Sequence, residues 1–213
     1  MVCLAGKEEP LDVHIADVAR CASERGRLVA KKLARIFGLS EEEALDLLEL
    51  VAILHDAGKA DEEYEGAEDY FPLHEAKSAT LAKAIFSELG ELGDVAIAAV
   101  ALHHYSHKEP RARQQAFSFK PRCKLAAVDS WRPRTKLGAV LAERLRKLWS
   151  EAQSKGISNT GYNDAVIKAI KDKYPKRALY AVMAVLGVLN RCDKEIAERN
   201  RGGERPSRRD TCR

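Results

Sequence analysis

The sequence of 213 residues predicts an all-α fold, a helical bundle with one long irregular connection after its fourth helix. Three observations lead to this prediction. Apolar residues recur every three or four positions along most of the chain, as they do on the buried face of a helix. Residues that cap or break helices stand at the ends of these segments. No two segments show the alternating pattern of a convincing strand pair.

The first two expected helical regions carry histidines on or beside their apolar faces. Residues 11–37 form the first, in which His14 stands in line with Val18 on the face that should look inward. The second begins at the capping box Ser-Glu-Glu-Glu at residues 40–43 and ends in the adjacent pair His55-Asp56. Such a pair taken alone is more often a core histidine followed by an exposed aspartate than a metal site.

The later helical patterns are separated by polar segments that contain glycine and proline. They cover residues 74–89, 94–105, 135–154, 163–173 and 176–199. The irregular connection covers residues 106–134, and connections of this length are usually functional or disordered. We therefore assign residues 1–199 to one domain and expect the basic tail, residues 200–213, to be disordered because it has almost no apolar residues to bury.

Composition favours a soluble cytoplasmic protein without a membrane segment. The chain has no leader-like apolar run near its start and no stretch that approaches 18 apolar residues. Its five cysteines are odd in number and lack CxxC spacing, which argues against a zinc ribbon and against a disulfide framework. We therefore expect a reducing compartment, and we expect Cys123 and Cys192 to be small buried apolar residues and not reactive thiols.

Histidines mark the candidate functional site. The chain has only six, at positions 14, 55, 74, 103, 104 and 107, and five of them fall at helix ends or on apolar helical faces. Each one alone would be read as a core residue with a hydrogen-bond partner. Together with Asp56 they predict a metal cluster, because helix ends from different parts of the chain can converge on one point and a metal ion satisfies several imidazoles at once.

The ordered series His14, His55-Asp56 with Gly58-Lys59, His74 and His103-His104 resembles the HD-domain metal-dependent phosphohydrolases. It is most similar to the CRISPR-associated HD nucleases, the nuclease half of the type I interference nuclease-helicase. The resemblance extends from His14 to Ala197. No GxxxxGK[ST] phosphate loop follows, so we expect this half to stand alone and to act with a separate helicase.

The resemblance implies two metal sites that share Asp56. One would use His14, His55, Asp56 and Asp193, and the other Asp56, His74, His103 and His104. The last aspartate has a rival, because Asp129 lies at a spacing closer to that of HD-domain cyclic-dinucleotide phosphodiesterases; we prefer Asp193. The resemblance also implies a catalytic role for Asp56 and for Lys59, whose ammonium would contact a phosphate oxygen or the attacking hydroxide.

Two divalent cations held by such residues can activate a bridging water and neutralise charge at a phosphoryl centre. Imidazole-rich ligation favours Mn, Ni, Co, Fe or Zn at least as much as Mg, which prefers oxygen ligands.

The expected substrate follows from the charge pattern after the tandem histidines. Residues 108–136 hold nine Lys or Arg against two acidic residues. The predicted nucleic-acid contacts are Lys108, Arg111, Arg113, Lys120 and Arg122. Aromatic residues between the basic ones, Tyr105, Phe117, Phe119 and Trp131, could stack with bases. A solvated basic loop with a few anchoring aromatics is the alternative.

The sequence therefore predicts a metal-dependent nuclease for single-stranded DNA, with RNA as a further substrate, in CRISPR interference. Its expected partners are a separate CRISPR helicase and an RNA-guided interference complex. One alternative is a small-molecule HD phosphohydrolase or cyclic-nucleotide phosphodiesterase. Another is a nonenzymatic nucleic-acid-binding protein whose metal only holds the fold.

Overall fold

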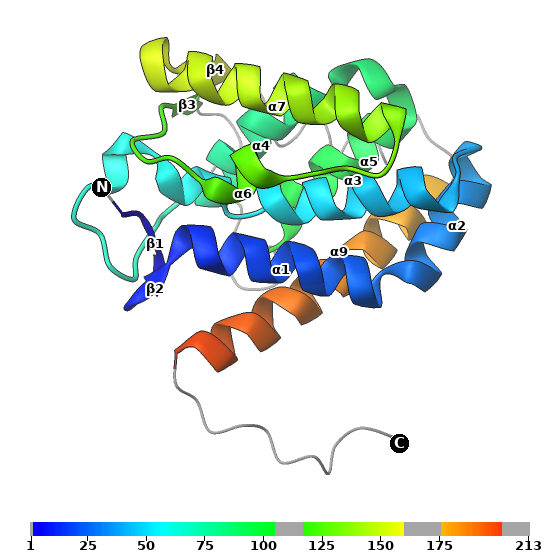
Figure 1. Cartoon of the computed structure of the whole chain (residues 1–213), viewed down its shortest axis with the longest axis horizontal. Helices are drawn as coiled ribbons and strands as arrows, with labels where there is room; N and C mark the ends of the chain where they lie inside the picture. Colours follow the sequence, from blue (N-terminus) through cyan, green and yellow to red (C-terminus); the bar gives the residue numbers. More distant parts are fainter. Residues whose placement is uncertain (1, 105–116, 160–175, 202–213) are drawn as a thin grey trace.

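The computed structural model describes residues 2–104, 117–159 and 176–201, and it shows a mainly helical protein (Figure 1). Its α-helices are α1 (Leu11–Arg25), α2 (Arg27–Phe37), α3 (Glu41–Leu54), α4 (His74–Phe86), α5 (Gly90–Leu102), α6 (Ala126–Ser130), α7 (Lys136–Lys155) and α9 (Lys176–Asn200). Short 3-10 helices are η1 (Ala57–Ala60), η2 (Glu62–Tyr64) and η3 (Ser87–Leu89). The predicted all-α class is confirmed. The helix expected at residues 163–173 lies outside the described residues, as does nearly all of the tail.

Helix α3 occupies the middle of the bundle. It packs against α1, α2, α4, α5 and α7, and Figure 1 shows it between α1 and α7. Most residues of α3 are apolar, and every residue from Leu50 to Leu54 is buried. The predicted capping box is present, since the Ser40 hydroxyl accepts a hydrogen bond from the Glu43 backbone and the Glu43 carboxylate accepts one from the Ser40 backbone. This buried, well-capped helix fixes the position of the His55-Asp56 pair at its end.

Two helix boundaries differ from the sequence prediction, and a glycine explains each difference. The region 11–37 is two helices, because the chain bends at Gly26, where an added Cβ would lie 2.9 Å from Cδ1 of Leu48. Conversely, Gly93 does not break a helix. It lies within α5, where its missing side chain lets the helix approach Phe86, whose carbonyl oxygen would be 2.1 Å from a Cβ. Helical apolar spacing does not distinguish these two uses of glycine.

Two small antiparallel strand pairs were not predicted. Strands β1 (Leu4–Gly6) and β2 (Glu9–Pro10) form one, and β3 (Phe117–Phe119) and β4 (Ile157–Asn159) form the other. Strands of two or three residues are too short to show an alternating pattern in the sequence. With α6, strand β3 also gives the predicted irregular connection some regular structure. The β1–β2 pair leads directly into α1.

The argument against a disulfide framework was wrong for four of the five cysteines. Disulfides join Cys3 to Cys123 and Cys21 to Cys192. The partners are 120 and 171 residues apart in sequence, so no local spacing could reveal them. The predicted burial of Cys123 and Cys192 is confirmed. The cysteines no longer indicate a reducing compartment, because disulfides persist mainly in oxidising compartments or in hyperthermophile proteins.

No helix in the described part of the chain is both long and apolar enough to cross a lipid bilayer.

Candidate metal centre

Seven side chains from five separate helix regions converge near one end of α3. Four of the regions present helix ends: the first turn of α1, the end of α3, the start of α4 and the end of α5; α9 contributes from its second half. The residues are His14, His55, Asp56, His74, His103, His104 and Asp193. They form two groups that could each hold a metal ion, and Asp56 belongs to both.

The two oxygens of the Asp56 carboxylate face different groups. Its Oδ1 lies 3.1 Å from Nε2 of His74 and 3.4 Å from Nε2 of His103. Its Oδ2 lies 3.4 Å from Nε2 of His14 and 3.5 Å from Nε2 of His55. Asp56 is 1% exposed. A carboxylate in this position can bridge two cations and hold their separation.

The orientation of three imidazoles is fixed by the backbone. Nδ1 of His55, His74 and His103 bonds to the carbonyl three residues earlier, at 2.6, 2.7 and 2.7 Å respectively. A carbonyl only accepts hydrogen bonds, so each Nδ1 carries the proton and each Nε2 keeps its lone pair. Those buried Nε2 atoms make no hydrogen bond, and neither does Oδ1 of Asp56. Acceptor atoms that face one another without a donor are what a cation site requires.

His14 is oriented by a carboxylate instead of a carbonyl. Its Nδ1 lies 2.7 Å from Oε1 of Glu9, which is 1% exposed. Glu9 also accepts hydrogen bonds from Asn200 and Arg201, each at 3.0 Å. Through Glu9, the β1–β2 turn and the end of α9 support His14. The sequence gives no signal for this role of Glu9, because a glutamate five positions before a histidine shares no helical or strand period with it.

The glycine after the His-Asp pair allows α4 to deliver His74. A Cβ on Gly58 would lie 2.1 Å from the carbonyl oxygen of His74 and 2.7 Å from the backbone nitrogen of Ser78. The Gly58 amide also donates to the Ser78 hydroxyl at 2.8 Å. Any larger residue would therefore push the start of α4 away from Asp56.

The charges around the cluster shift the pKa values of its members. Burial alone would lower the pKa of His14, but contacts with Asp193, Asp56 and Glu9 raise it to about 11. Burial opposes ionisation of Asp56 too, yet the charge of the Lys59 ammonium holds the pKa of Asp56 well below its usual range. Burial and the neighbouring His103 lower the pKa of His104 to about 2. A cation at Nε2 of His14 would therefore displace a proton.

A comparison with protein families agrees with this geometry. The family model of the HD domain matches residues 23–152, which is more than half of the chain. The chain belongs to the HD domain family. No curated protein matches it significantly. The HD domain and its buried His/Asp clusters make the protein a metal-dependent phosphohydrolase, and the two clusters are consistent with the binuclear metal site of HD domains.

Two of the candidate ligands lie outside the segment that matches the HD domain. His14 precedes it on α1 and Asp193 follows it on α9. Asp193 Oδ1 lies 3.1 Å from Nε2 of His14 and 3.7 Å from Nε2 of His55. Asp129, the rival for this role, lies in α6 and lines a different pocket. The structure thus places Asp193, and not Asp129, with the histidines of the HD domain.

Lys59 lies within the cluster and is almost entirely buried. Its ammonium donates to Oδ2 of Asp56 at 2.7 Å and to the carbonyl of Ala5 at 2.8 Å. In this arrangement it positions the shared carboxylate. Its contact with a phosphate oxygen stays a prediction.

The structure describes only some of the basic and aromatic residues that were predicted to bind nucleic acid. Lys108, Arg111, Arg113 and Tyr105 lie outside the described residues, as does the side chain of Phe117. Lys120 pairs with Glu62 at 2.9 Å, and Arg122 donates to the carbonyl of Tyr64 at 3.3 Å.

The proposed stacking role of two aromatics was wrong. Phe119 is fully buried and packs edge-on against Trp149, with ring centroids 5.6 Å apart. Trp131 is 7% exposed, and its indole N–H donates to Glu49 at 3.1 Å. Both rings belong to the hydrophobic core and cannot stack on bases.

Proposed function

We propose that this HD domain is a nuclease that hydrolyses phosphodiester bonds of single-stranded DNA, and also of RNA, during CRISPR interference. In this proposal it acts with a separate helicase and an RNA-guided complex in the cytoplasm. The observation that supports hydrolysis is the division of the Asp56 oxygens between two sets of unpaired imidazole nitrogens. The order of the ligands along the chain supports the nuclease assignment, as does the basic segment that follows His104.

The seven candidate ligands would form two metal sites. His14, His55 and Asp193 would hold one cation, His74, His103 and His104 the other, and Asp56 both. Two bound divalent ions would supply a water-derived nucleophile and neutralise the charge that develops on the phosphoryl group. The imidazole majority favours Mn, Fe, Co, Ni or Zn over Mg. The backbone carbonyls and Glu9 keep the rings in place, so little reorganisation is needed when the substrate arrives.

A specific observation favours a second candidate, a phosphohydrolase for a small nucleotide or cyclic nucleotide. Five of the seven candidate ligands are no more than 5% exposed, and two of the aromatics expected to bind a strand lie in the core. A recessed centre of this kind suits a substrate that can enter a pocket.

One experiment separates the two candidates. Metal-stripped protein is incubated with labelled single-stranded DNA, duplex DNA, RNA, mononucleotides and cyclic nucleotides, and each divalent metal is added back in turn. The nuclease proposal expects metal-dependent cleavage of the single strands at rates well above those for the small substrates. Turnover of small nucleotides without strand cleavage would establish the second candidate and overturn the first.

A further inference from the structure

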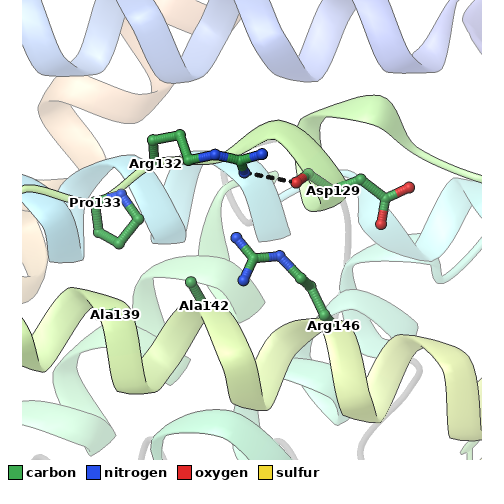
Figure 2. Close-up of a pocket in the computed structure, with 6 residues that line it drawn as sticks. All are labelled: Asp129, Arg132, Pro133, Ala139, Ala142 and Arg146. Carbon is green, nitrogen blue, oxygen red and sulfur yellow. Dashed lines mark hydrogen bonds between the residues drawn. The ribbon is translucent and has the colours of Figure 1, made fainter.

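A separate pocket lies between α7 and the loop that follows α6. It has a volume of about 390 Å³, which is within the range of about 300–1,000 Å³ typical of small-ligand sites. Its lining residues are Asp129, Arg132, Pro133, Ala139, Ala142 and Arg146 (Figure 2). None of the seven candidate metal ligands is among them.

Two guanidinium groups meet at this pocket because both bind one backbone oxygen. Nη1 of Arg132 donates to the carbonyl of Trp131 at 3.1 Å, and Nη2 of Arg146 donates to the same oxygen at 2.9 Å. The two nitrogens therefore lie no more than 6.0 Å apart, the sum of these distances. Figure 2 shows both guanidinium groups beside the pocket, whereas the carboxylate of Asp129 points away from them.

These two charges lack a counter-charge in the described part of the chain. Arg132 and Arg146 bind backbone carbonyls only, and neither forms an ion pair there. The contrast with Arg134 is direct, since it pairs with Asp46 at 3.0 Å and with Glu49 at 2.6 Å. Two cations this close repel each other, and an anion bound between them would relieve that repulsion.

The loop that carries Arg132 is held firmly. Asp46 is 1% exposed and accepts hydrogen bonds from the backbone nitrogens of Arg134 and Thr135, at 3.0 and 2.9 Å. Gly138 lets α7 pack against this loop, because a Cβ there would lie 2.5 Å from Cβ of Pro133. A rigid loop keeps its arginine in place without a ligand, so less conformational entropy is lost on binding.

We propose that this pocket binds the phosphate group of a phosphate monoester, with Arg132 and Arg146 as its charged contacts. Planar guanidinium groups match the oxygens of a phosphate by paired hydrogen bonds. Pro133 and the small side chains of Ala139 and Ala142 leave room for the organic part of the ligand. The site is independent of the proposed nuclease function. A mononucleotide and the 5′-phosphate of a DNA strand present the same chemistry.

The test is calorimetric titration of chelator-treated protein, so that bound metal does not attract phosphate elsewhere. The probes are a 5′-mononucleotide and a 5′-phosphorylated oligonucleotide, each compared with its dephosphorylated counterpart. We expect the phosphate to strengthen binding about tenfold or more for at least one probe. The probe that shows this effect identifies the source of the phosphate.

Variants make the assignment specific. Arg132→Gln and Arg146→Gln should each weaken binding about tenfold. Lys147→Gln removes one charge from an exposed residue of the same helix and should leave affinity unchanged. Because Arg146 also supports the loop, Arg132→Gln, at an exposed position, is the decisive variant, and melting temperatures check that each variant folds. Equal binding of phosphorylated and dephosphorylated probes would overturn the proposal, as would an equal loss from Lys147→Gln.

Discussion

At the scale of single residues, both halves of the candidate metal centre depend on Asp56. We expect Asp56→Asn to lose both metal equivalents and all hydrolysis, since an amide cannot bridge two cations. The change also leaves the Lys59 ammonium beside an uncharged amide, in a side chain only 9% exposed, so stability should fall by about 1–3 kcal/mol. Metal analysis and chemical denaturation measure the two effects. Wild-type metal content in the folded variant would refute the shared-ligand assignment.

Asp193 and Asp129 provide a matched pair for the last ligand. Asp193→Ala should lose one metal equivalent and most activity, because Asp193 Oδ1 lies 3.1 Å from Nε2 of His14. Asp129→Ala should lose neither, since Asp129 lines the other pocket. The measurement is metal stoichiometry by mass spectrometry of the purified variants. The reverse result would transfer the role to Asp129.

Glu9 offers a test of how the ligands are oriented. Glu9→Gln keeps the shape of the side chain but removes the charge that supports Nδ1 of His14, 2.7 Å away. Metal affinity at that half of the centre should fall about 10–100-fold, the usual cost of losing such a supporting group. Competition titration against a metal indicator measures it. Glu8→Gln, at an exposed neighbouring position, is the control and should leave the affinity unchanged.

At the scale of helices and strands, the predictable features were those with local signals. The capping box of α3, the starts of α4 and α7, and the inward face of α1 all follow from spacing and cap chemistry. The strand pairs, the bend at Gly26 and the disulfides depend on contacts between distant segments, which a periodic pattern cannot report. The candidate histidines and Asp56 were found because they stand at helix ends or on apolar helical faces, whereas Asp193 was chosen from the resemblance to HD-domain phosphohydrolases. Glu9 was missed because its role exists only after the β1–β2 turn folds back onto α1.

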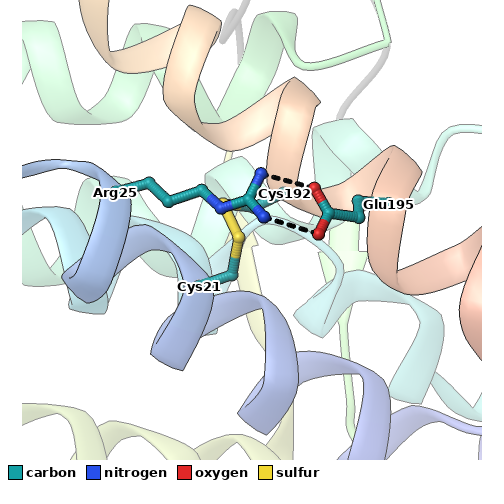
Figure 3. The surroundings of a disulfide bond; sticks show 4 residues. All are labelled: Cys21, Arg25, Cys192 and Glu195. Carbon is teal, nitrogen blue, oxygen red and sulfur yellow. Dashed lines mark hydrogen bonds and ion pairs between the residues drawn. A yellow bond between two sulfur atoms is a disulfide. The ribbon is translucent and has the colours of Figure 1, made fainter. Parts of the chain in front are cut away.

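The Cys21–Cys192 disulfide links the two helices that bring the outlying ligands. Cys21 lies on α1 with His14, and Cys192 directly precedes Asp193 on α9. The paired hydrogen bonds from Arg25 to Glu195 join the same helices beside it (Figure 3). We expect the double variant Cys21→Ser/Cys192→Ser to have a free energy of unfolding lower by about 2–5 kcal/mol. Affinity at the His14 half of the centre should weaken as well.

The other disulfide is the control for this prediction. Cys3–Cys123 joins the residue just before β1 to the segment after β3 and does not connect two ligand-bearing helices. Cys3→Ser/Cys123→Ser should therefore lower the melting temperature with a smaller effect on metal affinity. Denaturation and metal titration of both double variants, with oxidised and reduced wild type alongside, measure the difference. An equal loss of affinity in the two variants would mean that the effect is general loosening of the fold.

At the scale of the whole molecule, the distribution of charge is the feature that connects the phosphohydrolase centre to a polymeric substrate. The formal charge is only +4, but basic residues concentrate in residues 108–136 and towards the C-terminus. Of the described basic residues in the first of these segments, Lys120 and Arg134 already have carboxylate partners. The other concentration of positive charge lies in the C-terminal segment, which can be removed to test whether it attracts phosphates.

The structure determines where such a truncation should begin. Arg201 donates to Glu9 at 3.0 Å, and Glu9 supports His14, so deletion from residue 201 would disturb the candidate metal centre. Deletion of residues 202–213 removes four arginines and two acidic residues, a net charge of +2, and spares that contact. We expect an unchanged melting temperature and metal content, but weaker single-stranded DNA binding at low salt, where counterion release contributes most.

Binding measured against salt concentration should then show a shallower slope for the truncated chain than for the full-length chain. The slope is the decisive quantity, because it reports how many phosphate contacts release counterions and does not depend on the metal centre. Arg201→Gln is the companion variant: it should reduce metal affinity through Glu9 and change the salt slope less than the truncation does. Identical slopes for the full-length and truncated chains would show that the segment makes no contact with DNA phosphates.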